Sequence, residues 1–161
     1  MDGLDRAREL GSRENGLTVV IAKRQNGSPY ASVVNAGVLE HPVAGGQVVG
    51  FVSRGGTRKL PNLRRNPEIT VVFRSGWDWV AVEGKAELVG PDDPPSGLVD
   101  DDLPSLLRVI YAAAVGGSPN DWKQLDAVMA AEGHTAVLVR PIRCYSTPSE
   151  EPDIPDHRLT K

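Results

Sequence analysis

The feature that most constrains this chain is a series of short, apolar, β-branched segments with little room for helices between them. Five of these segments fall within the first 90 residues, at 17–24, 30–40, 47–53, 68–74 and 77–90. Turn-forming residues separate the first three, at 25–29 and at Gly45-Gly46. Strands joined by such short turns pair as antiparallel hairpins, whereas parallel strands need long crossover connections. The sequence therefore predicts an antiparallel meander rather than a doubly wound sheet.

Helices are predicted at three places. Residues 57–65 lack strand alternation and predict a short helix, which ends before Pro67 because proline disfavours helical geometry in the preceding residue. The Pro-, Gly- and Asp-rich residues 90–102 predict a surface loop, and apolar side chains then repeat at helical spacing over 103–115. A further helix is expected over 121–131, opened by Ser118-Pro119, before a last strand over 134–146.

These elements predict a mainly β fold with helices (α+β), in which six strands form a closed or nearly closed antiparallel barrel. No glycine-rich dinucleotide fingerprint follows any predicted strand, which argues against a Rossmann fold. A chain of 161 residues can bury one substantial core but not two. We therefore expect one domain over 1–147 and a polar C-terminal tail over 148–161 that is extended or disordered.

Composition excludes several classes of protein. No apolar run approaches the roughly 20 residues that a membrane helix needs, and the first residues are polar rather than signal-like. Cys144 is the only cysteine, so no internal disulfide can form and we expect a reducing cytoplasm. A net charge of −3 gives no overall attraction to nucleic acid or to anionic membranes, so any basic site must be local.

The most informative segment lies directly after the third predicted strand. It places five of the 18 basic residues close together in an acidic chain, at Arg54, Arg58, Lys59, Arg64 and Arg65. Several groups would converge on one anion here. They are the backbone N–H groups freed by Gly55-Gly56, the Thr57 hydroxyl, the start of the helix, and the side chains of Arg58 and Lys59. Alternatively, the last two arginines complement the end of the helix and the other basic residues form a solvated surface.

No catalytic or metal-binding group stands out in the sequence. His41, His134 and His157 are scattered, and each is interpreted as a surface or loop histidine. No Ser-His-acid arrangement and no Cys/His cluster at metal spacing can be assembled, so no metal is expected and the catalytic residues are left unassigned. Such a chain fits an enzyme whose cofactor carries the chemistry while the protein binds and orients it.

The basic segment also carries a family resemblance. Arg58-Lys59, followed by Asn-Leu-Arg-Arg-Asn-Pro at 62–67 and a β-branched strand, resembles the phosphate-site helix of the pyridoxamine 5'-phosphate oxidase-like superfamily of split β-barrels. Within that superfamily the chain is most similar to the branch that uses the deazaflavin coenzyme F420, flavin/deazaflavin oxidoreductase family B. The resemblance covers about residues 17–145 and includes Gly27-x-Pro29, Gly76-Trp77-x-Trp79, Glu83-Gly84-x-Ala86, Asp121-Trp122 and Pro141-Ile142.

The resemblance implies an FMN-binding-like split β-barrel that forms a homodimer with shared cofactor sites. Arg58 and Lys59 would then hold the cofactor's phosphate. The other implied positions are Thr57 and Asn62 in support, Ser32, Val34 and Asn35 along the ring system, and Trp77 and Trp79 from the partner subunit. From the residues alone, two tryptophans at i and i+2 lie on one face of a strand, where they would equally serve core or interface packing.

The cofactor is either FMN, with one phosphate, or F420, whose tail carries several negative charges. Arg54 and the other four cations supply more positive charge than one phosphate requires, which favours F420, as does the resemblance. The expected function is hydride transfer from reduced F420 to a conjugated small molecule such as an enone, a quinone or a tetrapyrrole-like acceptor.

Three other functions are weighed against this one. The first is an FMN-dependent oxidase of the pyridoxamine-phosphate type, and the second is a non-catalytic carrier of F420 or flavin. A nucleic-acid binder is disfavoured because no aromatic residue stands among the basic ones to stack on bases. The sequence identifies neither the substrate nor the proton donor.

Overall fold

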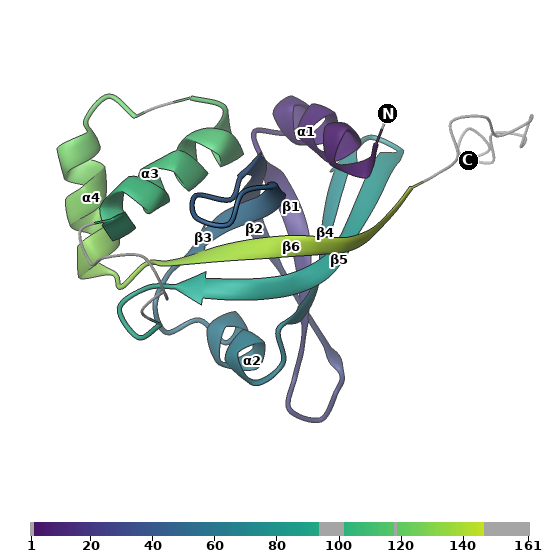
Figure 1. The fold of residues 1–161 in the computed structure, drawn as a ribbon, viewed down its shortest axis with the longest axis horizontal. Helices are drawn as coiled ribbons and strands as arrows, with labels where there is room; N and C mark the ends of the chain where they lie inside the picture. Colours follow the sequence, from purple (N-terminus) through teal and green to yellow (C-terminus); the bar gives the residue numbers. More distant parts are fainter. Residues whose placement is uncertain (1, 94–101, 118, 147–161) are drawn as a thin grey trace, which may run out of the picture.

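Ten helices and strands make up the described part of the computed structural model, which covers residues 2–93, 102–117 and 119–146 (Figure 1). In chain order they are α1 (Gly3–Arg13), β1 (Leu17–Lys23), β2 (Pro29–Glu40), β3 (Gln47–Ser53), α2 (Lys59–Arg65), β4 (Glu68–Ser75), β5 (Asp78–Val89), α3 (Asp102–Val115), α4 (Trp122–Ala131) and β6 (Thr135–Ser146). The strands close into a barrel in the order β1-β2-β3-β6-β5-β4, and every neighbouring pair is antiparallel. The predicted six-stranded antiparallel barrel is confirmed.

The element boundaries differ most from the sequence prediction at the helices. β3 has the predicted bounds, but α2 begins at Lys59 rather than at residue 57. The cap of α4 is Asp121 and not Ser118-Pro119, because the Asp121 carboxylate accepts hydrogen bonds from the N–H groups of Lys123 and Gln124 at 3.0 and 3.2 Å. Ser118 and the predicted tail at 148–161 lie outside the described residues.

No helix is predicted before the first strand, yet α1 forms there. Asp2 caps it by accepting hydrogen bonds from the N–H groups of Leu4 at 2.7 Å and Asp5 at 3.0 Å. Ala7, Leu10 and Gly11 are buried on one face of the helix. The signal that would have revealed α1 is therefore an Asp cap followed by apolar residues at i, i+3 and i+4.

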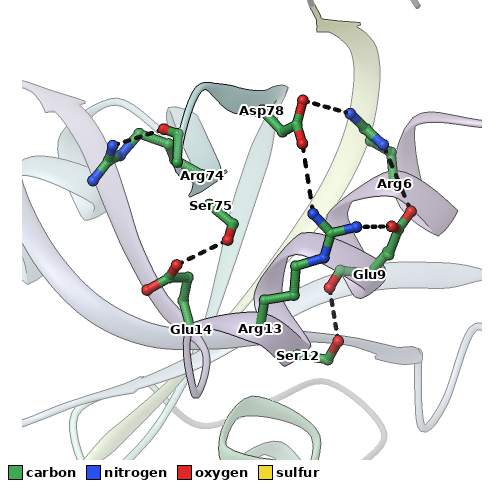
Figure 2. Close-up of polar contacts among 9 residues, drawn as sticks. Arg6, Glu9, Ser12, Arg13, Glu14, Arg74, Ser75 and Asp78 are labelled. Carbon is green, nitrogen blue, oxygen red and sulfur yellow. Dashed lines mark hydrogen bonds and ion pairs between the residues drawn. The ribbon is translucent and has the colours of Figure 1, made fainter.

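Ion pairs fasten α1 to the start of β5 (Figure 2). The Asp78 carboxylate lies 3.3 Å from the guanidinium of Arg6 and 3.5 Å from that of Arg13. Glu9 pairs with both arginines, so the four side chains form one network (Figure 2). Single exposed ion pairs contribute little, but a shared network restrains the turn that precedes β5.

The hydrophobic core has two parts. Inside the barrel, strand residues such as Val71 and Phe51 pack with Leu10 of α1 and Leu60 of α2, and these two helices cover opposite ends of the barrel (Figure 1). The second part joins the sheet to α3 and α4 and includes Leu39, Leu107, Ile110, Met129 and Leu138. Burying one such side chain fully contributes roughly 1.5–3 kcal/mol, so both layers of helices are tied firmly to the barrel.

Helix α3 approaches β2 closely at Gly37. A Cβ atom at this position would lie only 2.3 Å from the carbonyl oxygen of Ala113. The absence of a side chain at Gly37 thus lets the backbone of α3 lie against the sheet. None of the helices in the described ranges is long and apolar enough to cross a membrane.

Candidate functional site

The turn that follows β3 is held in place at both of its ends. Ser53 is buried, and its hydroxyl oxygen lies 2.9 Å from that of Thr57. The Gly55 N–H donates to the carbonyl oxygen of Glu132 at 3.1 Å, and Gly56 adopts a φ of 82°, where glycine is favoured. This framework presents Thr57, Arg58 and Lys59 together at the junction between β3 and α2.

Three of the five basic residues in this segment already have partners. Arg54 pairs with Glu132 at 3.3 Å, and Arg65 donates a hydrogen bond to Asn62 Oδ1 at 3.3 Å. Arg64 binds both carboxylate oxygens of Asp93, with Nε to Oδ1 at 2.9 Å and Nη2 to Oδ2 at 2.6 Å. The hydrogen bond to Asp93 raises the pKa of Arg64. The alternative for the last two arginines was that they complement the end of the helix. Arg64 instead binds the Asp93 carboxylate, and Arg65 binds the side chain of Asn62.

Arg58 and Lys59 differ from the other three basic residues. Neither forms an ion pair or side-chain hydrogen bond with any residue in the described ranges. Arg58 is exposed, whereas Lys59 is half-buried, and this burial lowers the pKa of its ammonium group. A half-buried cation without a partner is unfavourable unless a ligand supplies the counter-charge. The Thr57 hydroxyl beside them adds a neutral hydrogen-bonding group.

Asn62 and the β2 residues occupy different surroundings. Asn62 is a buried residue of α2, and its side-chain oxygen accepts the Arg65 hydrogen bond. Ser32 and Val34 pair across the sheet with Val20 and Thr18, whose side chains are buried, so they face the barrel interior. The Ser32 hydroxyl oxygen is buried and has no hydrogen-bond partner among the described residues.

Asn35 faces away from the barrel interior and is exposed, and its amide donates to the carbonyl oxygen of Asn15 at 2.9 Å. The structure therefore does not bring Ser32, Val34 and Asn35 to one surface. A planar ring on the outer face of β2 would meet the side chain of Asn35 but not those of the other two residues. The implied role of these three residues in ring binding stays a prediction.

The two tryptophans lie far from the basic turn within one chain. Trp77 lies in the turn before β5 and is exposed, so it does not share a strand face with Trp79 as expected. Trp79 is half-buried on β5 and meets the ring of Tyr145 edge to face at 6.0 Å between centroids. The Asp78 ion pairs place this turn beside α1, whereas α2 lies at the other end of the barrel (Figure 1). A single chain therefore does not combine the tryptophans with Lys59.

A cavity of about 240 Å³ opens between the sheet and the helices α3 and α4. Its lining includes Asn35, Val52, Tyr111, Leu125, Met129, Glu132 and His134. His134 is half-buried rather than at the surface, and its Nδ1 lies 3.2 Å from the carbonyl oxygen of Met129. No local sequence pattern indicates this cavity, because its walls come from separate elements of the chain.

His41 lies in the loop between β2 and β3, as the sequence predicts, but it is buried rather than at the surface. Only 4% of its surface is exposed. Its Nδ1 accepts hydrogen bonds from the N–H groups of Val43 and Ala44 at 3.2 and 3.0 Å, and its Nε2 lies 3.3 Å from Glu87. His41 therefore stabilises the turn between β2 and β3.

The chain forms a closed antiparallel barrel with a basic turn after its third strand, and sequence comparison gives the family. Residues 5–110 match the family model described as pyridoxamine 5'-phosphate oxidase. The chain therefore belongs to this family, which confirms the superfamily resemblance.

Solved structures with a similar fold come from several branches. A conserved hypothetical protein from Mycobacterium tuberculosis superposes with a TM-score of 0.61 at 18% identity, covering 86% of this chain and 81% of the other. An FMN-binding protein related to pyridoxamine 5'-phosphate oxidase, from Nostoc punctiforme, gives a TM-score of 0.53 at 15% identity and covers 88% and 78%. A protein described as an F420 reductase gives 0.52 at 16% identity and covers 86% and 94%. At these identities the likeness concerns the fold alone.

Proposed function

We propose that this chain binds coenzyme F420 and uses it to reduce a conjugated small molecule. The observation that carries the proposal is a pair of cations, Arg58 and half-buried Lys59, that have no side-chain partner among the described residues and lie beside the Thr57 hydroxyl. Family membership supports a phosphate-bearing redox cofactor at this turn. The choice of F420 rests on the resemblance of the basic segment and on the fold shared with a protein described as an F420 reductase.

The residues at this turn fit the phosphate of such a cofactor. Two cations and a hydroxyl would give charge-assisted hydrogen bonds to one phosphate, and buried Asn62 would support them by holding Arg65 on the same helix. Bound F420 would supply a hydride to an electrophilic carbon of the acceptor. The protein's part is to bind, to orient and to exclude water.

FMN is the second candidate, and the partnered arginines favour it. Because Arg54, Arg64 and Arg65 are engaged within the protein, the free positive charge at the turn is close to what one phosphate needs. The excess positive charge that favours F420 is therefore smaller than the number of basic residues in the segment indicates. An enzyme acting on a pyridoxamine-type substrate with FMN would use the same turn.

Titration of the purified chain with F420 and, separately, with FMN tests the proposal directly. Cofactor fluorescence reports binding in both cases, and we expect F420 to bind in the micromolar range or tighter with weaker binding of FMN. Preference for FMN would transfer the proposal to the second candidate, and binding of neither would end it. Turnover of an enone or quinone with reduced F420 then separates a reductase from a non-catalytic carrier.

We also propose a homodimer in which each subunit completes the partner's cofactor site. The outer face of β1 and β2 exposes Leu17, Val19 and Val33 to 52, 39 and 65% of their surface, and Val19 pairs across the sheet with Val33. Contiguous exposed apolar residues are typical of interaction surfaces. Such a dimer would give Trp77 and Trp79 a route to the partner's basic turn, which they lack within their own chain.

A charge placed on this face tests the dimer. Val33→Glu should convert the protein to monomers in sedimentation velocity and weaken cofactor binding at the same time. Val109→Glu is the matched control, because Val109 is similarly exposed but lies on α3. A wild-type monomer, or a monomeric Val33→Glu with full cofactor affinity, would exclude the shared site, and a Val33→Glu dimer would exclude this face as the interface. As the compartment we propose the cytoplasm, since a lone half-buried thiol needs no oxidising environment.

A further inference from the structure

The cavity under α3 and α4 has apolar walls and one polar end. Val52, Tyr111, Leu125 and Met129 supply apolar and aromatic surface, and Glu132 and His134 form the polar end. The volume of about 240 Å³ suits one or two fused rings and not a complete flavin or deazaflavin cofactor. A small planar molecule with a polar atom at one edge matches this lining best.

Glu132 links this cavity to the basic turn. Its backbone carbonyl accepts the Gly55 N–H at 3.1 Å, and its carboxylate pairs with Arg54 at 3.3 Å. Glu132 therefore both lines the cavity and supports the turn that presents Lys59. Asn35 also lines the cavity, and the family resemblance places this residue along the ring system of the cofactor. A molecule in the cavity would lie next to a cofactor whose phosphate is held at that turn.

We propose that this cavity is the acceptor site and takes a planar conjugated carbonyl compound, with His134 donating the proton to its oxygen. The proposal rests on the proposed function, because it assigns the second substrate of that reaction. Reduction of a conjugated carbonyl needs one hydride and one proton. The hydride, supplied by the reduced cofactor, forms a C–H bond at the β carbon as the C=C π electrons move toward the oxygen, and the oxygen takes the proton.

The geometry of His134 suits it to supply that proton. Its Nδ1 lies 3.2 Å from the carbonyl oxygen of Met129, which can only accept, so Nδ1 carries a hydrogen. Its Nε2 lies 3.6 Å from the carboxylate of Glu132, which in turn faces Arg54. When Nε2 carries a proton, it is the atom of this cavity placed to pass that proton to the acceptor oxygen, and water then returns it.

Filling the cavity from its rim tests the binding site without using activity. Val128 lines the cavity and is partly exposed, so Val128→Trp should fill it without opening the core. Ala127→Trp is the matched control, because Ala127 is exposed on the same helix and outside the lining. Chromone, a planar bicyclic conjugated ketone, serves as the probe. Two-dimensional amide NMR of the cofactor-free protein measures its dissociation constant.

We expect chromone to shift the amide signals of Met129 and His134. Val128→Trp should raise its dissociation constant at least tenfold, and Ala127→Trp should change it less than twofold. Both variants should keep wild-type affinity for F420. Shifts confined to other parts of the protein, or equal effects of the two variants, would overturn the acceptor site. Loss of F420 affinity in Val128→Trp would assign the cavity to the cofactor instead. If wild-type protein binds no F420, the proposed function fails, while the chromone titration still decides the cavity.

His134→Asn tests the proton transfer. The asparagine amide can still donate to the Met129 carbonyl, but the variant lacks Nε2. With reduced F420 present, we expect at least a tenfold lower kcat for chromone reduction and an unchanged thermal midpoint. The KM for chromone should change less than twofold, because the variant leaves the apolar walls of the cavity in place. An unchanged kcat in His134→Asn would assign His134 a purely structural role.

Discussion

The two halves of the basic segment carry the same charge and use it differently. At the start of α2, Arg58 and Lys59 have no charged partner among the described residues. At its end, Arg64 is held by Asp93 in a two-point ion pair and Arg65 donates to Asn62. The first half is open to an external anion, whereas the second fixes α2 to the loop that follows β5.

This difference teaches that a count of basic residues overstates the charge available to a ligand. Arg64 and Arg65 look as suitable for phosphate as Arg58 and Lys59 when only the sequence is considered. Their partners are Asp93, which is distant in sequence, and Asn62, which lies on the same helix. The free pair is therefore the part of the segment on which variants should act most strongly.

Replacement of Lys59 should have the largest effect on cofactor affinity. Lys59→Ala removes one charge-assisted contact to phosphate worth about 1.5–3 kcal/mol, or roughly 10- to 150-fold in the dissociation constant. Lys123→Ala is the matched control, because Lys123 is an exposed lysine on α4 outside the basic turn. Fluorescence titration measures both. Wild-type affinity in Lys59→Ala would remove the basic turn from the cofactor site.

Arg58→Ala should weaken binding less than Lys59→Ala. Arg58 is exposed, so water screens its contact with a phosphate and an arginine held there gives up more side-chain freedom. We expect a loss of about 0.5–1.5 kcal/mol in cofactor affinity, measured by the same titration. The order of the two variants is the informative result. A larger effect of Arg58 would mean that burial does not decide which cation dominates.

Much of the fold could be predicted from the sequence, because strand patterning is local. The six strands follow from β-branched runs separated by turn residues, and the antiparallel order follows from the short connections. Helix α1 was missed because its sequence is mostly polar. Its stability depends on Leu10 reaching the barrel core and on the ion pairs to Asp78 across the chain.

The candidate site could be predicted only where it is continuous in sequence. Residues 57–59 stand together at one strand end and were recognised as a unit. The alternation of side chains along β2 separates Ser32 and Val34 from Asn35, which a list of strand positions does not reveal. The cavity near His134 depends on how α3 and α4 pack on the sheet, and packing of distant elements leaves no local pattern.

Arg64→Ala should affect stability and leave cofactor affinity almost unchanged. The variant leaves the Asp93 carboxylate, which is largely buried, without its two-point partner. Because Arg64 itself is partly exposed, we expect a loss of only about 0.5–1 kcal/mol in the free energy of unfolding. Urea denaturation measures it, and the double variant with Asp93→Asn isolates the pair energy. If Arg64→Ala weakened cofactor binding as much as Lys59→Ala, the two halves of the basic segment would not differ in function.

The smallest expected effect is the pH dependence that Lys59 gives to stability. Burial lowers the pKa of this ammonium below the ordinary value of 10.5, so between the two values the unfolded chain binds more protons than the folded one. The free energy of unfolding of the wild type, relative to Lys59→Met, should therefore rise with pH in this alkaline window. Cofactor affinity should fall over the same window, because phosphate needs the charged lysine. If the free energy of unfolding rises with pH while cofactor affinity falls, Lys59 is a cation without a partner until a ligand binds. Parallel slopes would mean that Lys59 has an internal counter-charge like that of Arg64.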